Sequence, residues 1–496
     1  MARQRTADRD EAVEDTLDFR QAQEFLSTTR VTLYRWIAQK RVRAFKAGRQ
    51  WRFYKADLIQ FLEQPDPSVV HVAREEVERA VDLLRRWQTR GARRKAAALR
   101  PAPAMDEEPV RALAEALLDT ALRHETSHVH LDPSALGGTA RLRIDGVLHP
   151  IIDLSKSLYA PLVTHFKQVA EMDAADRASM QMGRIPTRTE GRADEVLVST
   201  LPTPRGEKLT LWLSSSVEAM PTLDDVGLSP EDRERLGKAL RQPTGIVIVG
   251  GPGGCGKTTV LYAALRSLVT PERSTMTIES TAYHWLPGAV QVQTNPRGGI
   301  TYASALQGVM RADPDIVAVM DVPDRETAAL SVEAGLSGHL VLLQLHANDA
   351  ASAIRRLIDL GVEPFLLASS LIASMNQRLV RQVCSECPAP LKVSDEVLRQ
   401  WRERAVAGGL AWPAGKAHFT HGKGCARCRG TGYHGRTAIF ELLEAYDEVA
   451  GLITRGAEAA ELREAGLRGG MTSLFADGIR KALAGVTSPL EVVRVT

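Results

Sequence analysis

A short apolar run that leads into a glycine-rich loop constrains this chain more than any other feature. Residues 246–249 read IVIV and predict a buried strand, and residues 260–268 have a helical pattern of apolar residues. The stretch 251–258 between them reads GPGGCGKT, which matches the GxxxxGK[ST] pattern. Glycines let backbone N–H groups converge on phosphate oxygens, and the start of the following helix adds its dipole. The sequence therefore predicts a phosphate-binding loop between a strand and a helix.

The residues of this loop have separate expected roles. Lys257 should reach the β- and γ-phosphates of a nucleotide, and the Thr258 hydroxyl should hold Mg²⁺. A chance glycine-rich turn is the weaker interpretation, because a strand precedes the loop and a helix follows it. We therefore expect ATP and Mg²⁺ as cofactors. The predicted nucleotide-binding residues are Gly251, Gly253, Gly254, Gly256, Lys257, Thr258 and Thr259.

Two later apolar runs end in residues that suit phosphoryl transfer. The run 315–320 ends at Asp321, whose carboxylate could hold Mg²⁺ or the attacking water. The run 338–345 is followed by His346, at the end of a strand where open α/β sheets bind their ligands. The alternatives are an ordinary strand that ends in a surface aspartate, and a histidine with a structural role.

Four of the five cysteines form two CxxC pairs, which are separated by 37 residues. Four thiolates suit tetrahedral Zn²⁺, and no open ligand position is implied, so we expect a structural metal site. The spacer can hold a small helix over 395–406. Free thiols are the alternative, and a redox role would need a thioredoxin-like helix that the pattern lacks. The predicted ligands are Cys384, Cys387, Cys425 and Cys428.

The N-terminal region has the pattern of a winged helix-turn-helix. Residues 19–26 and 30–37 have helical spacing, and a polar turn lies between them. In the stretch 42–53, apolar and basic residues alternate around a glycine, which predicts a β-hairpin wing. Residues 18–62 hold ten Lys+Arg and three acidic residues, so an anionic partner such as DNA is possible. Thr32, Tyr34 and Arg35 would then face the major groove, with Arg49 and Arg52 on the wing.

Prolines and changes in the pattern of apolar residues divide the chain into domains. The fold class is multidomain α/β, with a winged helix-turn-helix at 18–64 and a helical linker, expected to be solvated, at 65–108. A mixed α/β domain follows at 109–222, with a hairpin turn at Asp145-Gly146. A third domain at 223–496 contains the phosphate loop and carries the zinc-binding insertion at about 384–428.

Composition excludes several classes of protein. Apolar residues make up 44% of the chain, charged residues 25%, and the net charge is +3. These values are ordinary for globular proteins and exclude a disordered, collagen-like or coiled-coil chain. No run of about 18 apolar residues predicts a transmembrane helix, and the polar start lacks the apolar stretch of a secretory signal.

Several motifs, in order, resemble the type II secretion/type IV pilus assembly ATPase family. The resemblance covers about three-quarters of the chain, from residue 109 onward, and the N-terminal region resembles excisionase/MerR-like winged domains. The matching stretches are SHVHLDP at 127–133, RIDGVL at 143–148, STLPT at 199–203, GVEPFLLASS at 361–370, QRLVR at 377–381 and TGYHGR at 431–436.

The resemblance implies a homo-hexameric ATPase that is cytoplasmic and peripheral to the inner membrane, where it docks on a platform protein. The domain at 223–496 would be RecA-like and hold the nucleotide, and arginines of the 109–222 domain would approach its phosphates. The catalytic residues that the resemblance and the motifs predict together are Asp321, Glu279, His346, His339, Arg143 and Arg184, with Arg141 and Arg177 in matching segments.

The chain departs from the family pattern at its catalytic boxes. Ser280 stands where the family has an aspartate, Asp321 where it has a glutamate, and Pro323 where it has an arginine. Aspartate is one methylene shorter than glutamate, and a misplacement of about 1 Å can cost on the order of 10²-fold in rate. We therefore expect a slow ATPase. The alternative is a degenerate nucleotide-sensing regulator that binds DNA, and the N-terminal domain could equally dock a protein.

Overall fold

The computed structural model describes residues 16–25, 42–47, 50–55, 57–58, 74–88, 108–189, 192–213, 221–415 and 417–496. The chain forms two compact units, residues 1–74 and 75–496.

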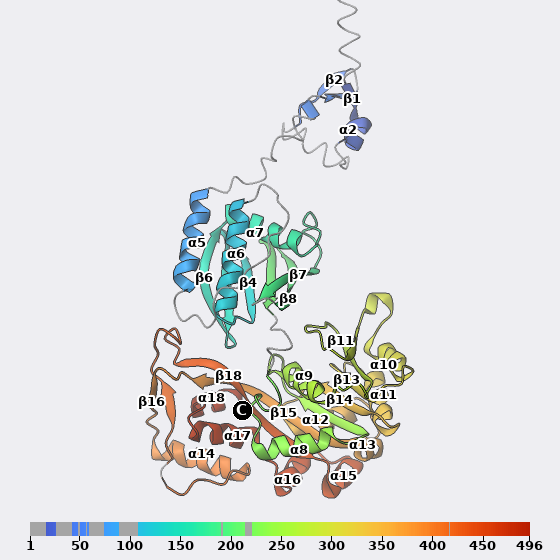
Figure 1. Ribbon diagram of the computed structural model, residues 1–496, viewed down its shortest axis with the longest axis vertical. Coiled ribbons are helices and arrows are strands. Elements are labelled where there is room, and N and C mark those ends of the chain that lie inside the picture. Colours follow the sequence, from blue (N-terminus) through green and yellow to red (C-terminus); the bar gives the residue numbers. More distant parts are fainter. Residues whose placement is uncertain are drawn as a thin grey trace, which may run out of the picture. The chain divides into compact units, whose positions relative to one another are not determined.

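The first unit contains a small antiparallel sheet and one described helix (Figure 1). Its elements are β1 (Thr16–Asp18), α2 (Phe19–Phe25), β2 (Phe45–Ala47) and β3 (Gln50–Tyr54), with strand order β1-β3-β2. The β2–β3 hairpin confirms the predicted wing, whereas β1 was not predicted. Ala22, Phe53 and Leu58 are fully buried and form its core. The predicted second helix, with Thr32, Tyr34 and Arg35, lies outside the described residues, as does Arg49.

In its described residues, the N-terminal part of the second unit contains a six-stranded antiparallel sheet and three helices. The strand order is β6-β5-β4-β9-β8-β7. The predicted turn at Asp145-Gly146 joins β5 to β6, and both residues have a positive φ, of 51° and 83°. The elements are α5 (Arg74–Gln88), α6 (Glu108–Arg123), β4 (His128–Ser134), β5 (Gly137–Ile144), β6 (Val147–Ser155), α7 (Lys156–Val169), β7 (Gln181–Thr189), β8 (Arg192–Thr203) and β9 (Gly206–Leu213).

Helix α5 corrects the prediction of a solvated linker at 65–108. The helix is mostly charged, but Val77, Ala80 and Leu84 are buried along one narrow stripe. At its end the Gln88 side-chain amide donates to Asp119 Oδ2 and Thr120 Oγ1 of α6, both at 3.0 Å. The helix therefore belongs to the second unit. The exact domain boundaries remain a prediction.

A seven-stranded sheet follows, in the order β12-β11-β13-β14-β10-β15-β18. All neighbouring strands pair in parallel except β15 and β18. Its strands are β10 (Gly245–Gly250), β11 (Thr275–Glu279), β12 (Ala289–Gln293), β13 (Ile316–Val319), β14 (Leu340–Leu345), β15 (Leu371–Val383) and β18 (Tyr433–Glu444). The helices around them are α8 (Pro230–Leu240), α9 (Lys257–Leu268), α10 (Tyr302–Met310), α11 (Arg325–Leu336), α12 (Ala350–Asp359) and α13 (Pro364–Ser370).

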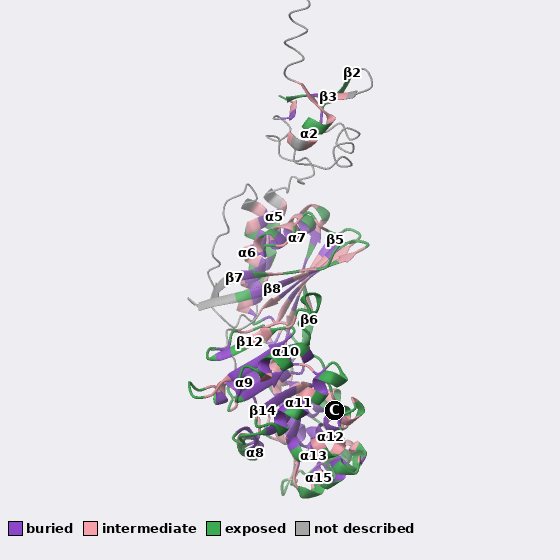
Figure 2. Cartoon of the chain, turned by 90° about the vertical axis from the view of Figure 1, so that its right-hand side faces the viewer, coloured by how far each residue is buried: buried purple, intermediate pink, exposed green. Residues whose placement is uncertain are grey.

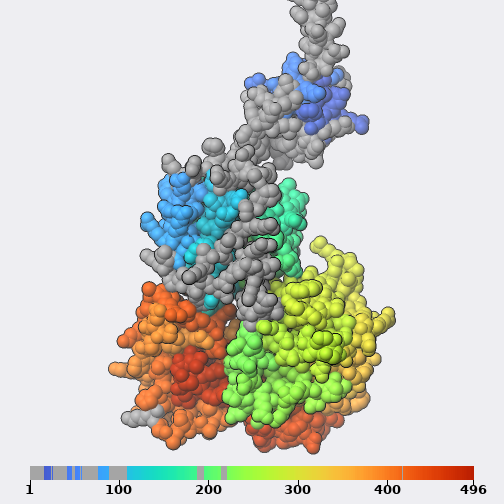
Figure 3. All heavy atoms as spheres, in the orientation of Figure 1, coloured from blue at the N-terminus to red at the C-terminus, as the bar shows by residue number. Residues whose placement is uncertain are grey.

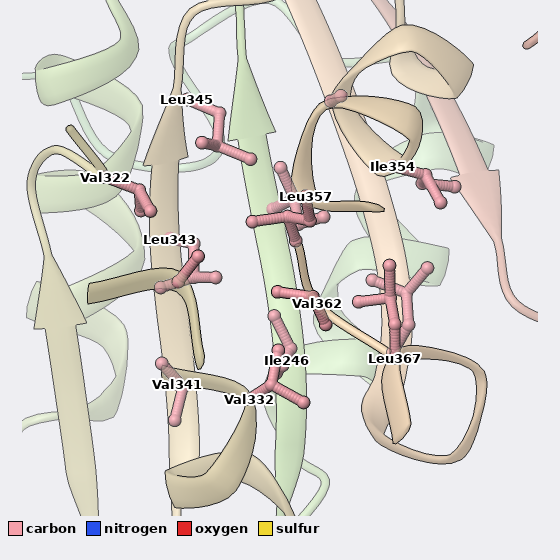
Figure 4. Packing of buried hydrophobic residues seen from close by; sticks show 14 of the residues in the cluster. Ile246, Val322, Val332, Val341, Leu343, Leu345, Ile354, Leu357, Val362 and Leu367 are labelled. Atoms are coloured by element: carbon pink, nitrogen blue, oxygen red, sulfur yellow. The ribbon is translucent and has the colours of Figure 1, made fainter. Parts of the chain in front are cut away.

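The central strands are buried on both faces, as their continuous apolar runs predict. Side chains of β10 alternate between two cores: Ile246 packs with α11 to α13, and Val247 packs with α8 and α9. Figure 4 shows Ile246, Leu343 and Leu357 meeting on the first of these faces. The burial colouring marks the same strands as the most enclosed part of the unit (Figure 2).

The C-terminal part carries the predicted insertion. Its helix α14 (Asp395–Ala407) confirms the helix expected between the cysteine pairs, and β16 (Pro388–Pro390) pairs with β17 (Thr420–Gly422). Phe419 of the insertion packs with Phe475 and Val492 near the C-terminus, so the orange and red segments adjoin in Figure 3. The last helices are α15 (Asp447–Thr454), α16 (Ala459–Arg468), α17 (Leu474–Leu483) and α18 (Pro489–Val495).

Candidate functional site

The loop over 251–256 joins β10 to α9 in the predicted strand–loop–helix order. Gly251 has φ of 149°, and an added Cβ would lie 2.4 Å from Cys255 Sγ and 2.9 Å from the carbonyl oxygen of Gln377. Gly256 caps the helix with φ of 91°. At Gly253 and Gly254 a Cβ would meet nothing within 4 Å. The loop is therefore tightly held at its base and open where a phosphate would approach.

Lys257 begins α9 and turns its side chain back over the loop. Its Nζ donates to the carbonyl oxygens of Gly251 at 2.9 Å and Pro252 at 2.8 Å, and the side chain is buried. Burial lowers the pKa of Lys257, whereas nearby Cys255 and Asp321 act to raise it. The ammonium group is therefore held inside the phosphate loop, and Asp321 is close enough to influence its pKa.

Thr258 contacts a residue that the sequence did not single out. Its hydroxyl donates to Gln344 Oε1 at 3.2 Å. Gln344 is the fifth residue of β14, the strand between β10 and β13 in the sheet. Thr259 is the next residue of α9 and is half-buried. The amide of Gln344 thus lies beside the hydroxyl predicted to hold Mg²⁺.

Strand β15 supplies a second group of residues next to the loop. Gln377 is buried, and its Nε2 donates to the carbonyl oxygen of Cys255 at 2.8 Å. Arg378 donates to the carbonyl oxygen of Asn348 at 2.6 Å and to the Asn376 side chain at 2.7 Å. These residues connect the phosphate loop to the segment after β14. In the sequence this pair belongs to the QRLVR stretch of the family resemblance and has no predicted role.

Asp321 and His346 both lie at the carboxyl edge of the parallel sheet, as the phosphate loop does. Asp321 follows β13 and is half-buried, and its Oδ1 accepts the N–H of Val322 at 2.9 Å. His346 follows β14 and is exposed. The predicted convergence of these residues with Lys257 and Thr258 at one edge therefore agrees with the topology.

Glu279 ends β11 at the same edge but is enclosed in a hydrogen-bond network. Its Oε2 accepts from the Tyr262 hydroxyl at 2.8 Å, and its Oε1 accepts from Thr277 at 2.6 Å and Gln291 at 2.9 Å. The carboxylate is 2% exposed. Burial and the neighbouring Glu279 raise the pKa of Tyr262. In this arrangement Glu279 fixes α9 against the sheet, and both of its oxygens are engaged.

The catalytic role predicted for His339 does not fit the structure. His339 precedes β14, and its Nδ1 lies 2.6 Å from the carbonyl oxygen of Pro314, just before β13. Its own carbonyl accepts the N–H of Gly245 at the start of β10. His339 therefore lies at the amino edge, and six strand residues at about 3.3 Å each separate it from the phosphate loop by about 20 Å.

The two predicted arginines make contacts away from the phosphate loop. Arg143 of β5 donates to the carbonyl oxygen of Gly146 at 3.0 Å. Arg184 of β7 pairs with Glu195 at 2.5 Å and donates to the carbonyl oxygen of Ala282 at 3.1 Å, three residues after Glu279. Arg184 thus reaches the segment that follows β11. Their approach to phosphates stays a prediction.

The four predicted cysteine ligands come together in the structure. Their Sγ atoms all lie within 4.8 Å of one another, with Cys384–Cys425 at 3.7 Å and Cys387–Cys428 at 3.8 Å. Zn–S bonds of about 2.3 Å at tetrahedral angles require S···S separations of about 3.8 Å. Burial acts against ionisation of Cys428, but N–H groups of Cys425 and Gly432 lower its pKa to about 7. The donor set and spacing therefore fit zinc.

Comparison with known proteins decides the family. The family model described as "Type II/IV secretion system protein" matches residues 103–494. The chain belongs to this family. A Pseudomonas aeruginosa "Type II secretion system protein HxcR" is 41% identical over 391 residues, which are 79% of this chain and 78% of the relative. The Thermus thermophilus "Type IV pilus assembly ATPase PilB" is 38% identical over 395 residues, 79% of this chain and 43% of that protein. This secretion-family chain is therefore an ATPase.

Two further comparisons concern the fold. The "X-ray structure of the Legionella pneumophila ATPase DotB" matches with a TM-score of 0.57 at 18% identity, covering 81% of this chain and 99% of that one. A helix-turn-helix family model matches residues 16–65 of the secretion-family chain. Among the described residues, no helix is both long and apolar enough to cross a bilayer.

Proposed function

We propose that this chain is the ATP-driven motor of a type II secretion or type IV pilus-like assembly system. It would act as a homo-hexamer in the cytoplasm, peripheral to the inner membrane, together with a membrane platform protein. One observation carries the proposal: the complete phosphate loop lies at the same sheet edge as Asp321 and His346. The names of the HxcR and PilB relatives support secretion or pilus assembly as the process.

Each residue at this edge would have a separate role in phosphoryl transfer. Backbone N–H groups of the loop and the start of α9 would bind the phosphates, and Lys257 would neutralise charge that builds on the γ-phosphate. Thr258 and Asp321 offer the oxygen ligands that Mg²⁺ prefers, and the ion would neutralise negative charge between the β- and γ-phosphates. Gln344 would orient the Thr258 hydroxyl that it already contacts. His346, exposed beside them, would sense the γ-phosphate.

We expect the motor to be slow, because the carboxylate of Asp321 is one methylene shorter than that of a glutamate. We expect Asp321→Glu to raise the hydrolysis rate about tenfold, because the extra methylene restores reach toward the attacking water. Steady-state phosphate release at saturating ATP measures this effect. Asp324→Glu is the matched control, because Asp324 caps α11 through the N–H of Thr327 and should leave the rate within about twofold. A rate unchanged by Asp321→Glu would show that reach is not what limits the enzyme.

We also propose that Cys384, Cys387, Cys425 and Cys428 hold one structural Zn²⁺. The four thiolates leave no ligand position for water or substrate, so the site would stabilise the insertion and take no part in hydrolysis. The spacing of the sulfur atoms supports this assignment.

The alternative function, a nucleotide-sensing regulator that binds DNA, has one specific observation in its favour. The helix-turn-helix match covers the first unit, and its hairpin places Lys46 and Arg52 on paired strands, with Lys46 Nζ 5.2 Å from the Trp51 ring. If this unit binds DNA, affinity for a duplex should fall at least 10²-fold between about 50 and 200 mM salt. Fluorescence anisotropy with the full chain tests this, and an absence of binding at the lower salt concentration would favour a protein-docking role.

A further inference from the structure

One arginine joins the second cysteine pair to the helices at the start of the same unit. Arg429 follows Cys428 directly and has a left-handed backbone, with φ of 52°. Its guanidinium carbon lies 4.9 Å from the ring centroid of Trp87 in α5, and its Nη2 hydrogen-bonds Nδ1 of His124 just after α6. The side chain therefore contacts two helices through a cation–π interaction and a hydrogen bond.

The protonation of His124 is fixed by this contact. A guanidinium only donates, so Nδ1 of His124 must accept, and the ring proton must sit on Nε2. Nε2 lies 3.3 Å from the carbonyl oxygen of Trp87, which is a suitable acceptor. The imidazole is fully buried, and its ring centroid lies 4.5 Å from that of Trp87 in an edge-on arrangement. His124 thus links α5, α6 and Arg429 in one hydrogen-bonded chain.

A second contact lies close by in sequence. The N–H of Gly435 donates to Asp145 Oδ2 at 2.9 Å, at the turn between β5 and β6. On β6, burial lowers the pKa of His149 and the positive charge of Arg429 lowers it further, which places Arg429 near this strand as well. The segment after the second cysteine pair therefore docks on α5, α6 and the β5–β6 turn.

We propose that metal binding at the four-cysteine site is required for the segment after Cys428 to dock on α5 and α6. The four-cysteine site holds the backbone around Cys428 in the conformation that directs Arg429 onto Trp87 and His124. Metal binding and the docking of these helices then stabilise each other, because any such coupling is reciprocal. This inference rests on the proposed zinc site and gives that site a role beyond its own local folding.

The first arm of the test compares two arginines that flank Cys428. Arg429→Ala removes the docking contact, whereas Arg427→Ala removes an exposed arginine that pairs with Glu386 at 3.0 Å. Hydrogen exchange of the full chain should show segments 77–88 and 113–124 exchanging about tenfold faster in Arg429→Ala, since a partly buried cation–π contact and a hydrogen bond are lost. Arg427→Ala should match the wild type. Equal exchange in the two variants would overturn the docking claim.

The second arm removes the metal. Incubating the wild-type chain with a strong zinc chelator should raise exchange in the same two segments, and Arg429→Ala should release zinc to a colorimetric chelator about tenfold faster than Arg427→Ala. If zinc is present but its removal leaves both segments protected, the coupling is wrong. If freshly purified protein holds no metal while Arg429→Ala still loosens the helices, the zinc site and the coupling fail together, and only the docking contact survives.

Discussion

Replacing Lys257 with alanine should reduce ATP hydrolysis by on the order of 10²-fold or more and weaken ATP binding at least tenfold. The reason is electrostatic: Lys257 is the one loop side chain whose cation can neutralise charge on the γ-phosphate, and removal of a single preorganised donor from such a site costs about 10²–10³-fold in rate. Nζ donates to the loop carbonyls of Gly251 and Pro252, so the cation is already held inside the loop.

Isothermal titration with Mg·ATP and steady-state phosphate release test this prediction on the same preparations. The matched control is Lys238→Ala, which removes an exposed lysine of α8 that pairs with Glu234. The control should bind and hydrolyse ATP as the wild type does. Equal ATP affinity in the wild type and Lys257→Ala would mean that the loop does not bind the nucleotide in the proposed way.

Replacing Cys428 with serine should abolish zinc binding and unfold the insertion between the two cysteine pairs. Structural zinc contributes about 10–16 kcal/mol of apparent binding energy in small zinc-finger peptides, and that energy is available for folding. The short strands β16 and β17 and the helix α14 have only a small apolar core, which packs on α17 and α18. Without the metal, α14 should lose its protection from hydrogen exchange.

Metal analysis of freshly purified protein provides the direct measurement, with one zinc expected per wild-type chain. Cys255→Ser is the control, since Cys255 lies in the phosphate loop and outside the quartet, and it should retain the metal. Less than about half an equivalent of zinc in the wild type would argue against the site.

The features that the sequence predicted correctly are local ones. The phosphate loop needs only a strand, a glycine pattern and a helix in order, and Gly251 and Gly256 have the backbone that the pattern requires. The cysteine quartet likewise follows from two tight pairs, although the 37-residue spacer gave no hint of how the pairs would meet. The position of Asp321 and His346 at the carboxyl edge of the sheet was predictable, because each follows an apolar run that forms a parallel strand.

The errors and omissions arise where the order of strands in the sheet, or the packing of side chains, determines the position of a residue. His339 is predicted as catalytic from the resemblance, yet it precedes β14 and so lies at the opposite edge of the sheet from the loop. Gln344 and Arg378 become visible only when β14 and β15 are known to flank β10. The helix α5 was predicted but its burial was not, although Val77, Ala80 and Leu84 form an apolar stripe at helical spacing among many charged residues.

The central claim is that this secretion-family chain hydrolyses ATP with Asp321 at the position where the family pattern predicts a glutamate. The most direct test is the hydrolysis rate of the wild type and Asp321→Ala at saturating Mg·ATP, with ATP binding measured in parallel. Loss of a positioned carboxylate should slow hydrolysis about 10²-fold while ATP affinity changes little. If Asp321→Ala hydrolyses ATP as fast as the wild type at equal binding, Asp321 has no catalytic role and the central claim is contradicted.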